Sequence, residues 1–156
     1  MRRMRAPCEG GRAMMQTVKA SLVVPYAHRL HGYAGRCSRL HGHNGLVTLV
    51  LAGAPRGNHG FVADFYDVRF MLQQATQSID HTLVVSSADP LCELLRSAGE
   101  PLEVSHVAPT AEYFARRVFD FVSAMSAGQP WCVESVEWEE EPGFTASVRQ
   151  SKESGQ

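Results

Sequence analysis

The segment Cys37–His43 places one thiol and two imidazoles within seven residues of the chain. The residues that follow have the composition of a strand, and alternate side chains of a strand leave the same face of a sheet. His41 and His43 can therefore point at one metal ion, and Gly42 between them adds no bulk. A catalytic zinc site needs three protein ligands and an open fourth position. The segment supplies two candidate ligands and, in Cys37, a further reactive group.

His28 is the best candidate for the third ligand. It lies at the end of a stretch that alternates like a strand, and a hairpin would bring it beside the start of the next strand. The alternative is an ordinary surface or core histidine without a ligand. Because His41 and His43 lie on the neighbouring strand, a metal-ligand role for His28 is about as well supported as that of an ordinary histidine.

Cys37 has two chemical roles open to it. It can be a fourth ligand, which would close a structural zinc site. It can instead be an unligated thiol whose pKa is lowered by nearby cations, acting as a base or nucleophile. A small buried hydrophobic residue is the commonest fate of a free cysteine. The polar neighbours Arg36, Ser38 and Arg39 argue against that fate here.

Two acidic features could complete a site. Asp80 directly precedes His81, and a carboxylate beside an imidazole fixes its tautomer and raises its basicity. The simpler interpretation is that both residues only end a helix. The acidic run near the C-terminus would ordinarily be a solvated strand face, but one of its members could bind an amidine-like ligand edge through two parallel hydrogen bonds. That run consists of Glu134, Glu137, Glu139, Glu140 and Glu141.

Composition favours a single domain without a nucleic-acid or membrane partner. The 156 residues are 44% hydrophobic and carry a formal net charge of -1, which gives no basic footprint for nucleic acid. No apolar run is long enough to span a bilayer, and no apolar segment follows the basic N-terminus as in a secretory signal. The four cysteines lack CxxC spacing, which favours reduced thiols in the cytoplasm. We expect a disordered leader over 1–16, one domain over 17–150 and a polar tail over 151–156.

The apolar pattern predicts an α+β fold that would position these residues. We expect two helices, one over 65–78 after an N-cap at Asp64 and one that follows Thr110 and ends near Gly128. In the first, Phe65, Val68 and Leu72 would share a buried stripe. The stretch 82–108 is the least regular, with room for a short helix over 90–97 and a brief extra strand over 102–104. The predicted strands cover 17–28, 42–52, 131–140 and 145–149, so we expect an antiparallel four-stranded sheet with two helices packed on one face.

Several stretches together resemble the 6-pyruvoyl-tetrahydropterin synthase / 6-carboxy-tetrahydropterin synthase family. The resemblance covers residues 17–148, and Cys-x-x-x-His-Gly-His is its most specific part. The chain departs from the family at Val85, Glu141 and Val148, where Asn, Thr and Tyr are usual. The matching stretches are Ala27-His28-Arg29-Leu30, Cys37-x-x-x-His41-Gly42-His43, Asp64-Phe65, Asp80-His81, Pro109-Thr110-Ala111-Glu112 and Val136-Glu137-Trp138-Glu139-Glu140-Glu141-Pro142.

The resemblance implies a T-fold (tunnelling fold) subunit that assembles into a trimer-based homo-oligomer, a hexamer, with active sites between subunits. It implies Cys37 as the proton-transferring thiol and Asp80 with His81 as its partner dyad, delivered by a neighbouring subunit. It also implies a pterin-anchoring glutamate, and the family's terminal pattern selects Glu140 for this role. The implied zinc ligands are His28, His41 and His43.

The function implied by the resemblance is zinc-dependent 6-carboxy-5,6,7,8-tetrahydropterin synthesis from 7,8-dihydroneopterin triphosphate, a step toward queuosine and related deazapurines. Triphosphate and acetaldehyde would be released. Arg29, Arg36 and Arg39 are candidates to bind the triphosphate, although solvated loop arginines are the simpler interpretation for at least two of them. The alternatives are a 6-pyruvoyl-tetrahydropterin synthase, an aldolase-like relative, and a zinc- or pterin-binding module without turnover.

Overall fold

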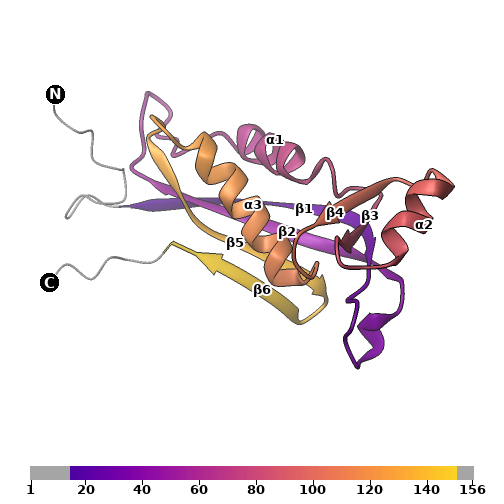
Figure 1. Ribbon diagram of the computed structural model, residues 1–156. Helices are drawn as coiled ribbons and strands as arrows, with labels where there is room; N and C mark the ends of the chain where they lie inside the picture. The colour runs from indigo at the N-terminus through magenta and orange to yellow at the C-terminus, as the bar shows by residue number, and fades with distance from the viewer. Residues whose placement is uncertain (1–14, 151–156) are drawn as a thin grey trace, which may run out of the picture.

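The fold is built on one mixed sheet of six strands, in the order β4-β3-β1-β2-β5-β6 (Figure 1). The computed structural model describes residues 15–150. The strands are β1 (Gln16–His28), β2 (His41–Gly53), β3 (Thr82–Ser86), β4 (Leu102–Ser105), β5 (Trp131–Glu141) and β6 (Phe144–Arg149). The helices are α1 (Phe65–Thr76), α2 (Leu91–Ala98) and α3 (Ala111–Met125), with a short 3-10 helix over Arg36–Ser38.

The long hairpin of β1 and β2 is the centre of the sheet. The two strands pair antiparallel over their full length, from Gln16 opposite Gly53 to His28 opposite His41. Along both strands, side chains on the helix-covered face are more buried than their neighbours, as strand alternation requires. The hairpin therefore brings the end of β1 directly beside the start of β2, as the sequence predicted.

The prediction of a four-stranded, wholly antiparallel sheet was incomplete. β3 pairs with the end of β1, and β4 pairs with β3, and both pairings are parallel. Thr82–Ser86 is only five residues long and has adjacent buried residues at Val84 and Val85, so it lacks the alternation that marks a half-buried strand. The short helix and the extra strand expected in 82–108 are present as α2 and β4.

Helices α1 and α3 pack on one face of the sheet and enclose the core with it (Figure 1). Asp64 caps α1 by accepting a hydrogen bond from the Tyr66 amide at 2.7 Å, and Thr110 caps α3. Val68 and Leu72 are buried as predicted, but Phe65 is 63% exposed. Phe114 of α3 and Trp138 of β5 are fully buried and stack at 4.8 Å between ring centroids.

Two expectations, one about the chain ends and one about the cysteines, compare with the structure as follows. The predicted leader and tail fall outside the described residues, apart from Met15 and Gln16, and Gln16 already belongs to β1. Cys37 and Cys92 are free thiols, whereas Cys132 is disulfide-bonded, so the expectation of reduced cysteines throughout was wrong. The cytoplasmic location that rested on it stays a prediction. Within residues 15–150, no helix has the length and apolarity needed to cross a membrane.

Candidate metal centre

Three imidazoles converge where β1 ends and β2 begins. His28 lies opposite His41 in the strand register, and His43 follows two residues along β2 on the same face. Their ring centroids are 4.6 Å apart for His28 and His41, 5.2 Å for His28 and His43, and 4.9 Å for His41 and His43. One nitrogen from each ring lies within 4.8 Å of the others, which is a spacing that a single ion can bridge.

Backbone carbonyls fix the tautomers of two of these rings. Nδ1 of His28 lies 2.7 Å from the Pro109 carbonyl oxygen, and Nδ1 of His41 lies 2.7 Å from the Arg39 carbonyl oxygen. A carbonyl oxygen can only accept, so each Nδ1 carries the proton and donates it. Nε2 of each ring is then left with a free lone pair. Nδ1 of His43 faces the Glu141 carboxylate at 3.7 Å.

The inward nitrogens of two of these rings are left without a hydrogen bond among the described residues. Nε2 of His28 and Nε2 of His43 are buried and make no hydrogen bond in the described part of the chain. Burial lowers the pKa of His28 below its ordinary 6.5, so the ring is neutral at pH 7. Buried polar atoms without a partner are costly, and a metal ion bound to the lone pairs removes that cost. The three residues therefore fit a divalent metal such as zinc.

Cys37 is not part of this histidine cluster. The group that could hold an ion, within residues 15–150, consists of the three histidines alone. Cys37 lies half-buried in the 3-10 helix between β1 and β2, and its carbonyl oxygen accepts a hydrogen bond from the Leu30 amide at 2.8 Å. That bond ties the thiol-bearing turn to the residues directly after His28. Three histidine ligands would leave a fourth position at a bound metal for another ligand.

Glu140 reaches the same place from β5. Its Oε1 lies 3.3 Å from Nε2 of His28 and 3.9 Å from Nε2 of His43, close contacts that lack hydrogen-bond alignment. The Tyr26 hydroxyl donates a hydrogen bond to the same oxygen at 2.9 Å. The carboxylate that the resemblance selected as a pterin anchor thus lies against the metal-binding nitrogens.

Asp80 and His81 form a pair in the turn directly before β3. Nδ1 of His81 lies 2.8 Å from the Asp80 carboxylate, and the His81 amide donates to the Pro25 carbonyl oxygen at 2.7 Å. His81 has a positive φ of 53°, a conformation that costs a residue with a Cβ some energy. Its side chain is 79% exposed, and no hydrogen bond or ion pair among the described residues joins it to Cys37. Within one chain the pair faces outward.

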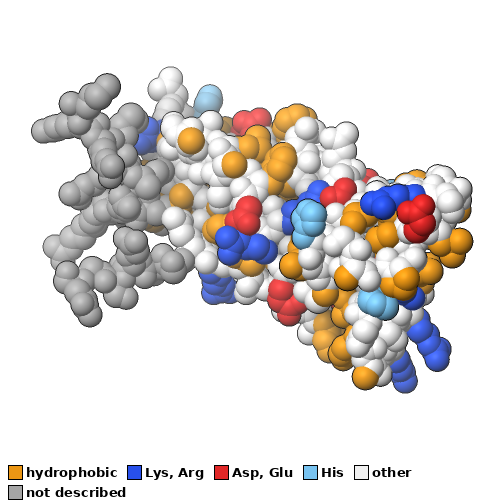
Figure 2. Space-filling view, in the orientation of Figure 1, with side chains coloured by type: hydrophobic (Ala, Val, Ile, Leu, Met, Phe, Trp, Pro, Cys, Tyr) orange, Lys and Arg blue, Asp and Glu red, His pale blue; other side chains and the backbone are white. Residues whose placement is uncertain are grey.

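Arg29 is engaged in the fold and is a poor candidate for the triphosphate. Its guanidinium binds both carboxylate oxygens of Asp89, whose side chain is fully buried. Asp89 also accepts from the Leu91 amide at the start of α2. The pair therefore fastens α2 to the loop that carries Cys37. Arg36 and Arg39 of that loop are exposed, and basic side chains project from this end of the molecule in Figure 2.

Replacing Asp89 with Asn should lower the free energy of unfolding by about 2–3 kcal/mol at pH 7, because the Arg29 guanidinium loses its charged partner at a buried position. The Arg29 guanidinium holds the pKa of Asp89 below its ordinary 3.8. The ion pair therefore stabilises the protein above that pH and is lost as the pH falls below it. Urea unfolding at pH 7 and pH 3 should show the difference between variant and wild type shrinking with acid.

The matched control for this prediction is Asp120→Asn. Asp120 pairs with Arg116 one helical turn away, and both side chains are more than half exposed. Exposed pairs of this kind contribute little to stability, so this substitution should leave the free energy of unfolding nearly unchanged. If both substitutions lowered the free energy of unfolding by the same amount, the Arg29–Asp89 pair would stabilise the protein no more than an exposed pair does.

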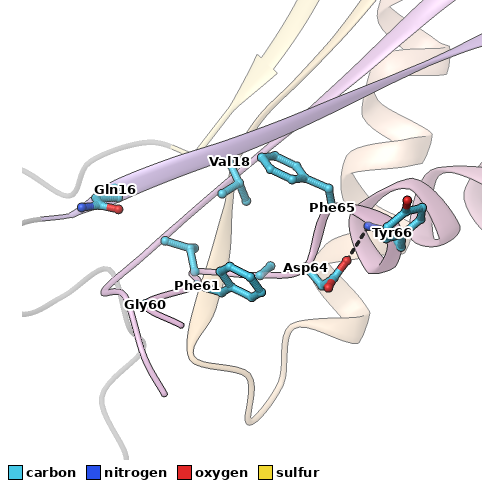
Figure 3. A pocket seen from close by; sticks show the side chains of 9 residues that line it. Gln16, Val18, Gly60, Phe61, Asp64, Phe65 and Tyr66 are labelled. Atoms are coloured by element: carbon cyan, nitrogen blue, oxygen red, sulfur yellow. Dashed lines mark hydrogen bonds between the residues drawn. The ribbon is translucent and has the colours of Figure 1, made fainter. Parts of the chain in front are cut away.

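Two hollows of the surface lie apart from the histidines. A pocket of about 280 Å³ is lined by Gln16 and Val18 of β1 and by the segment 60–66 before and into α1, with Phe61 and Phe65 around it (Figure 3). Val18 is ten residues from His28 along an extended strand, or about 33 Å. A second hollow touches Asp80 but contains none of the three histidines. The metal centre is thus defined by its side chains and lies in neither hollow.

Two residues of the site could not be found from their type and spacing. Pro109 contributes a carbonyl oxygen, which every residue has, so only the packing of the α3 entry against β1 reveals it. Tyr26 precedes His28 by two residues and shares its face of β1, which makes it a neighbour of the site but does not indicate a polar role.

Known proteins resemble this chain over most of its length. It is 27% identical over 114 residues to the 6-carboxy-5,6,7,8-tetrahydropterin synthase of Aquifex aeolicus, covering 67% of this chain and 70% of that one. It is 32% identical over 87 residues to a probable enzyme of the same name from Halobacterium salinarum, covering 54% and 55%.

Solved structures agree on the fold. An uncharacterized protein of Wolinella succinogenes superposes with a TM-score of 0.75 at 19% identity, covering 89% of this chain and all of that one. The 6-pyruvoyl tetrahydropterin synthase of Caenorhabditis elegans superposes with a TM-score of 0.67 at 20% identity, covering 90% and 99%. At these identities the likeness establishes the T-fold, with six strands and three helices in this chain.

A family model described as 6-pyruvoyl tetrahydropterin synthase matches residues 17–151, which is nearly the whole chain. The match includes the three converging histidines, Cys37, the Asp80–His81 pair and Glu140. The chain belongs to the 6-pyruvoyl tetrahydropterin synthase family.

Proposed function

We propose that this protein is a zinc-dependent 6-carboxy-5,6,7,8-tetrahydropterin synthase acting on 7,8-dihydroneopterin triphosphate. The observation that carries the proposal is the convergence of three histidines, two of which, His28 and His43, have a buried Nε2 that makes no hydrogen bond with the described residues. Two relatives from different organisms bear the name of this activity. The product would enter queuosine and related deazapurine synthesis.

His28, His41 and His43 would hold zinc through Nε2, with Nδ1 of the first two tied to backbone carbonyls. When bound, the ion would act as a Lewis acid toward the hydroxyls of the substrate side chain and lower their pKa. The carbonyl contacts keep both rings in the tautomer that a metal requires. They also orient the two rings before zinc binds, so less conformational entropy is lost when the metal is bound.

Cys37 would remove a proton from the side-chain carbon next to the pterin ring. The role suits a thiol that is half-buried, unpaired and outside the group of metal ligands. His81, oriented by Asp80, would return or relay protons. Because that pair faces outward, we propose that it serves the site of a neighbouring subunit in a trimer-based homo-oligomer, a hexamer.

Glu140 would hold the amino edge of the pterin, which places the reacting carbon over the metal. Its carboxylate lies 3.3 Å from His28, so a pterin held there would be adjacent to the ion. Arg36 and Arg39 are the exposed loop arginines that could bind the triphosphate, since Arg29 is paired with Asp89. Triphosphate would leave, and cleavage of a carbon–carbon bond with uptake of one water molecule would release acetaldehyde and leave a carboxylate on the pterin.

Two other functions are distinguishable by their products. The family's name and its structural relatives keep 6-pyruvoyl-tetrahydropterin synthesis as the second candidate. A zinc- or pterin-binding module without turnover would require a closed site, which the position of Cys37 outside the metal group disfavours.

The test is to incubate zinc-loaded protein with 7,8-dihydroneopterin triphosphate and to identify the products by mass spectrometry. We expect a carboxy-pterin, acetaldehyde and triphosphate, none of which should form after the metal is removed by chelation. A pyruvoyl-pterin would transfer the assignment to the second candidate. Absence of turnover would reject both enzymes.

A further inference from the structure

We propose that Tyr26 is a positioning residue that holds the Glu140 carboxylate at the metal centre, and that Trp138 in turn orients the Tyr26 hydroxyl. The inference rests on the proposed function, in which Glu140 binds the pterin. It adds Tyr26 of β1 and Trp138 of β5 to the residues that position the substrate-binding carboxylate.

A directed chain of hydrogen bonds supports this role. The Trp138 indole N–H donates to the Tyr26 hydroxyl oxygen at 3.3 Å, and the Tyr26 hydroxyl donates to Glu140 Oε1 at 2.9 Å. An indole nitrogen can only donate and a carboxylate can only accept, so the hydroxyl proton has one direction in which to point. The chain therefore ends at the oxygen that faces His28 and His43.

Packing leaves the Tyr26 ring little freedom. Tyr26 is 4% exposed and Trp138 is fully buried, and their rings meet edge to face at 5.4 Å between centroids. Phe114 also contacts the Tyr26 ring, at 4.8 Å. Gly45 of β2 lies against both residues, because a Cβ there would come within 3.0 Å of the Tyr26 ring and of the Trp138 indole nitrogen. Because the Tyr26 ring is packed on several sides, its hydroxyl can fix the position of the Glu140 carboxylate to which it donates.

Glu140 depends on this hydroxyl. Within the described part of the chain, Tyr26 is the one residue that donates a hydrogen bond to the Glu140 carboxylate. The nearby Nε2 atoms of His28 and His43 would be occupied as metal ligands in the proposed enzyme and could not donate. The Glu140 side chain is 22% exposed, so it remains reachable by a ligand while one oxygen is held.

Tyr26→Phe should therefore weaken pterin binding and spare the metal. We expect zinc-loaded Tyr26→Phe to bind neopterin about tenfold more weakly than the wild type, as one lost hydrogen bond to a charged group implies. Its affinity for zinc should stay within about threefold, since all three histidines remain. A merely structural role would lower both affinities together, so calorimetric titrations with neopterin and with zinc separate the two explanations.

A second readout needs no substrate. The chain has two tryptophans, so Trp131→Phe assigns the indole N–H resonance of Trp138 in 15N-tryptophan-labelled protein. Glu140→Gln should shift that resonance through Tyr26, whereas Tyr113→Phe should not. Tyr113 is the matched control, because its hydroxyl also takes part in one partly buried hydrogen bond, which it accepts from Arg117 at 3.3 Å.

The two readouts keep this proposal separate from the proposed function. An unshifted Trp138 indole in Glu140→Gln, or wild-type neopterin affinity in Tyr26→Phe, would overturn the positioning role. If zinc-loaded wild-type protein does not bind neopterin, the proposed function fails, while the indole shift still decides whether Tyr26 holds Glu140.

Discussion

Cys37→Ala is expected to lower turnover of 7,8-dihydroneopterin triphosphate by about a thousandfold while one zinc ion per chain stays bound. Loss of a positioned base costs about 10²- to 10⁴-fold in rate. Zinc should be retained because the group that can hold it consists, within residues 15–150, of His28, His41 and His43. The combination of lost activity and intact metal binding separates a base from a ligand.

The measurement is a single-turnover assay combined with zinc quantification on the same preparation. Cys92→Ala is the matched control: Cys92 is also a free thiol, but it is buried in α2, where it donates to the Ser86 carbonyl oxygen. That control should keep near-wild-type activity. Full activity in Cys37→Ala would remove the thiol from the mechanism, and loss of zinc would make Cys37 a ligand.

His41→Ala should weaken zinc binding by more than about a hundredfold. Changes to residues that only orient a ligand already cost 10- to 100-fold in metal affinity, so removal of a ligand should cost more. His41 is the suitable ligand to remove, because it is only half-buried and its loss disturbs the core less than loss of the buried His28. Turnover should fall with metal occupancy.

Competition against a chromophoric zinc chelator measures this loss directly. His59→Ala is the control, since His59 is an exposed loop residue that stacks on Phe61 away from the metal centre. The control should bind zinc as the wild type does. Equal affinity in His41→Ala and the wild type would mean that the ion, if bound, lies elsewhere.

The metal centre was predictable because strand geometry is periodic. Two histidines separated by one residue must share a face of a strand, and a hairpin must bring the end of β1 beside the start of β2. Spacing and pairing therefore made His28, His41 and His43 candidates, the family resemblance selected them as the ligand set, and the structure places them together. The helix caps at Asp64 and Thr110 were predictable for a similar reason, because capping is a local interaction.

The parallel strands and the polar contacts around the metal were not predictable in the same way. Thr82–Ser86 is short and buried, and a run of adjacent apolar residues does not distinguish a strand from other buried segments. Glu140 could be selected among five acids only through the family's pattern. Its contact with Tyr26 joins residues 114 positions apart, and no local signal encodes such a contact.

In the proposed enzyme, His28, His41 and His43 hold zinc, the fourth position of the metal is open, and Cys37 is not a ligand. X-ray absorption spectroscopy of the zinc-loaded wild-type protein tests it most directly. We predict three nitrogen neighbours and one oxygen at about 2.0–2.1 Å, with no sulfur. A sulfur neighbour at about 2.3 Å would identify a closed, cysteine-ligated site and would contradict the proposed enzyme.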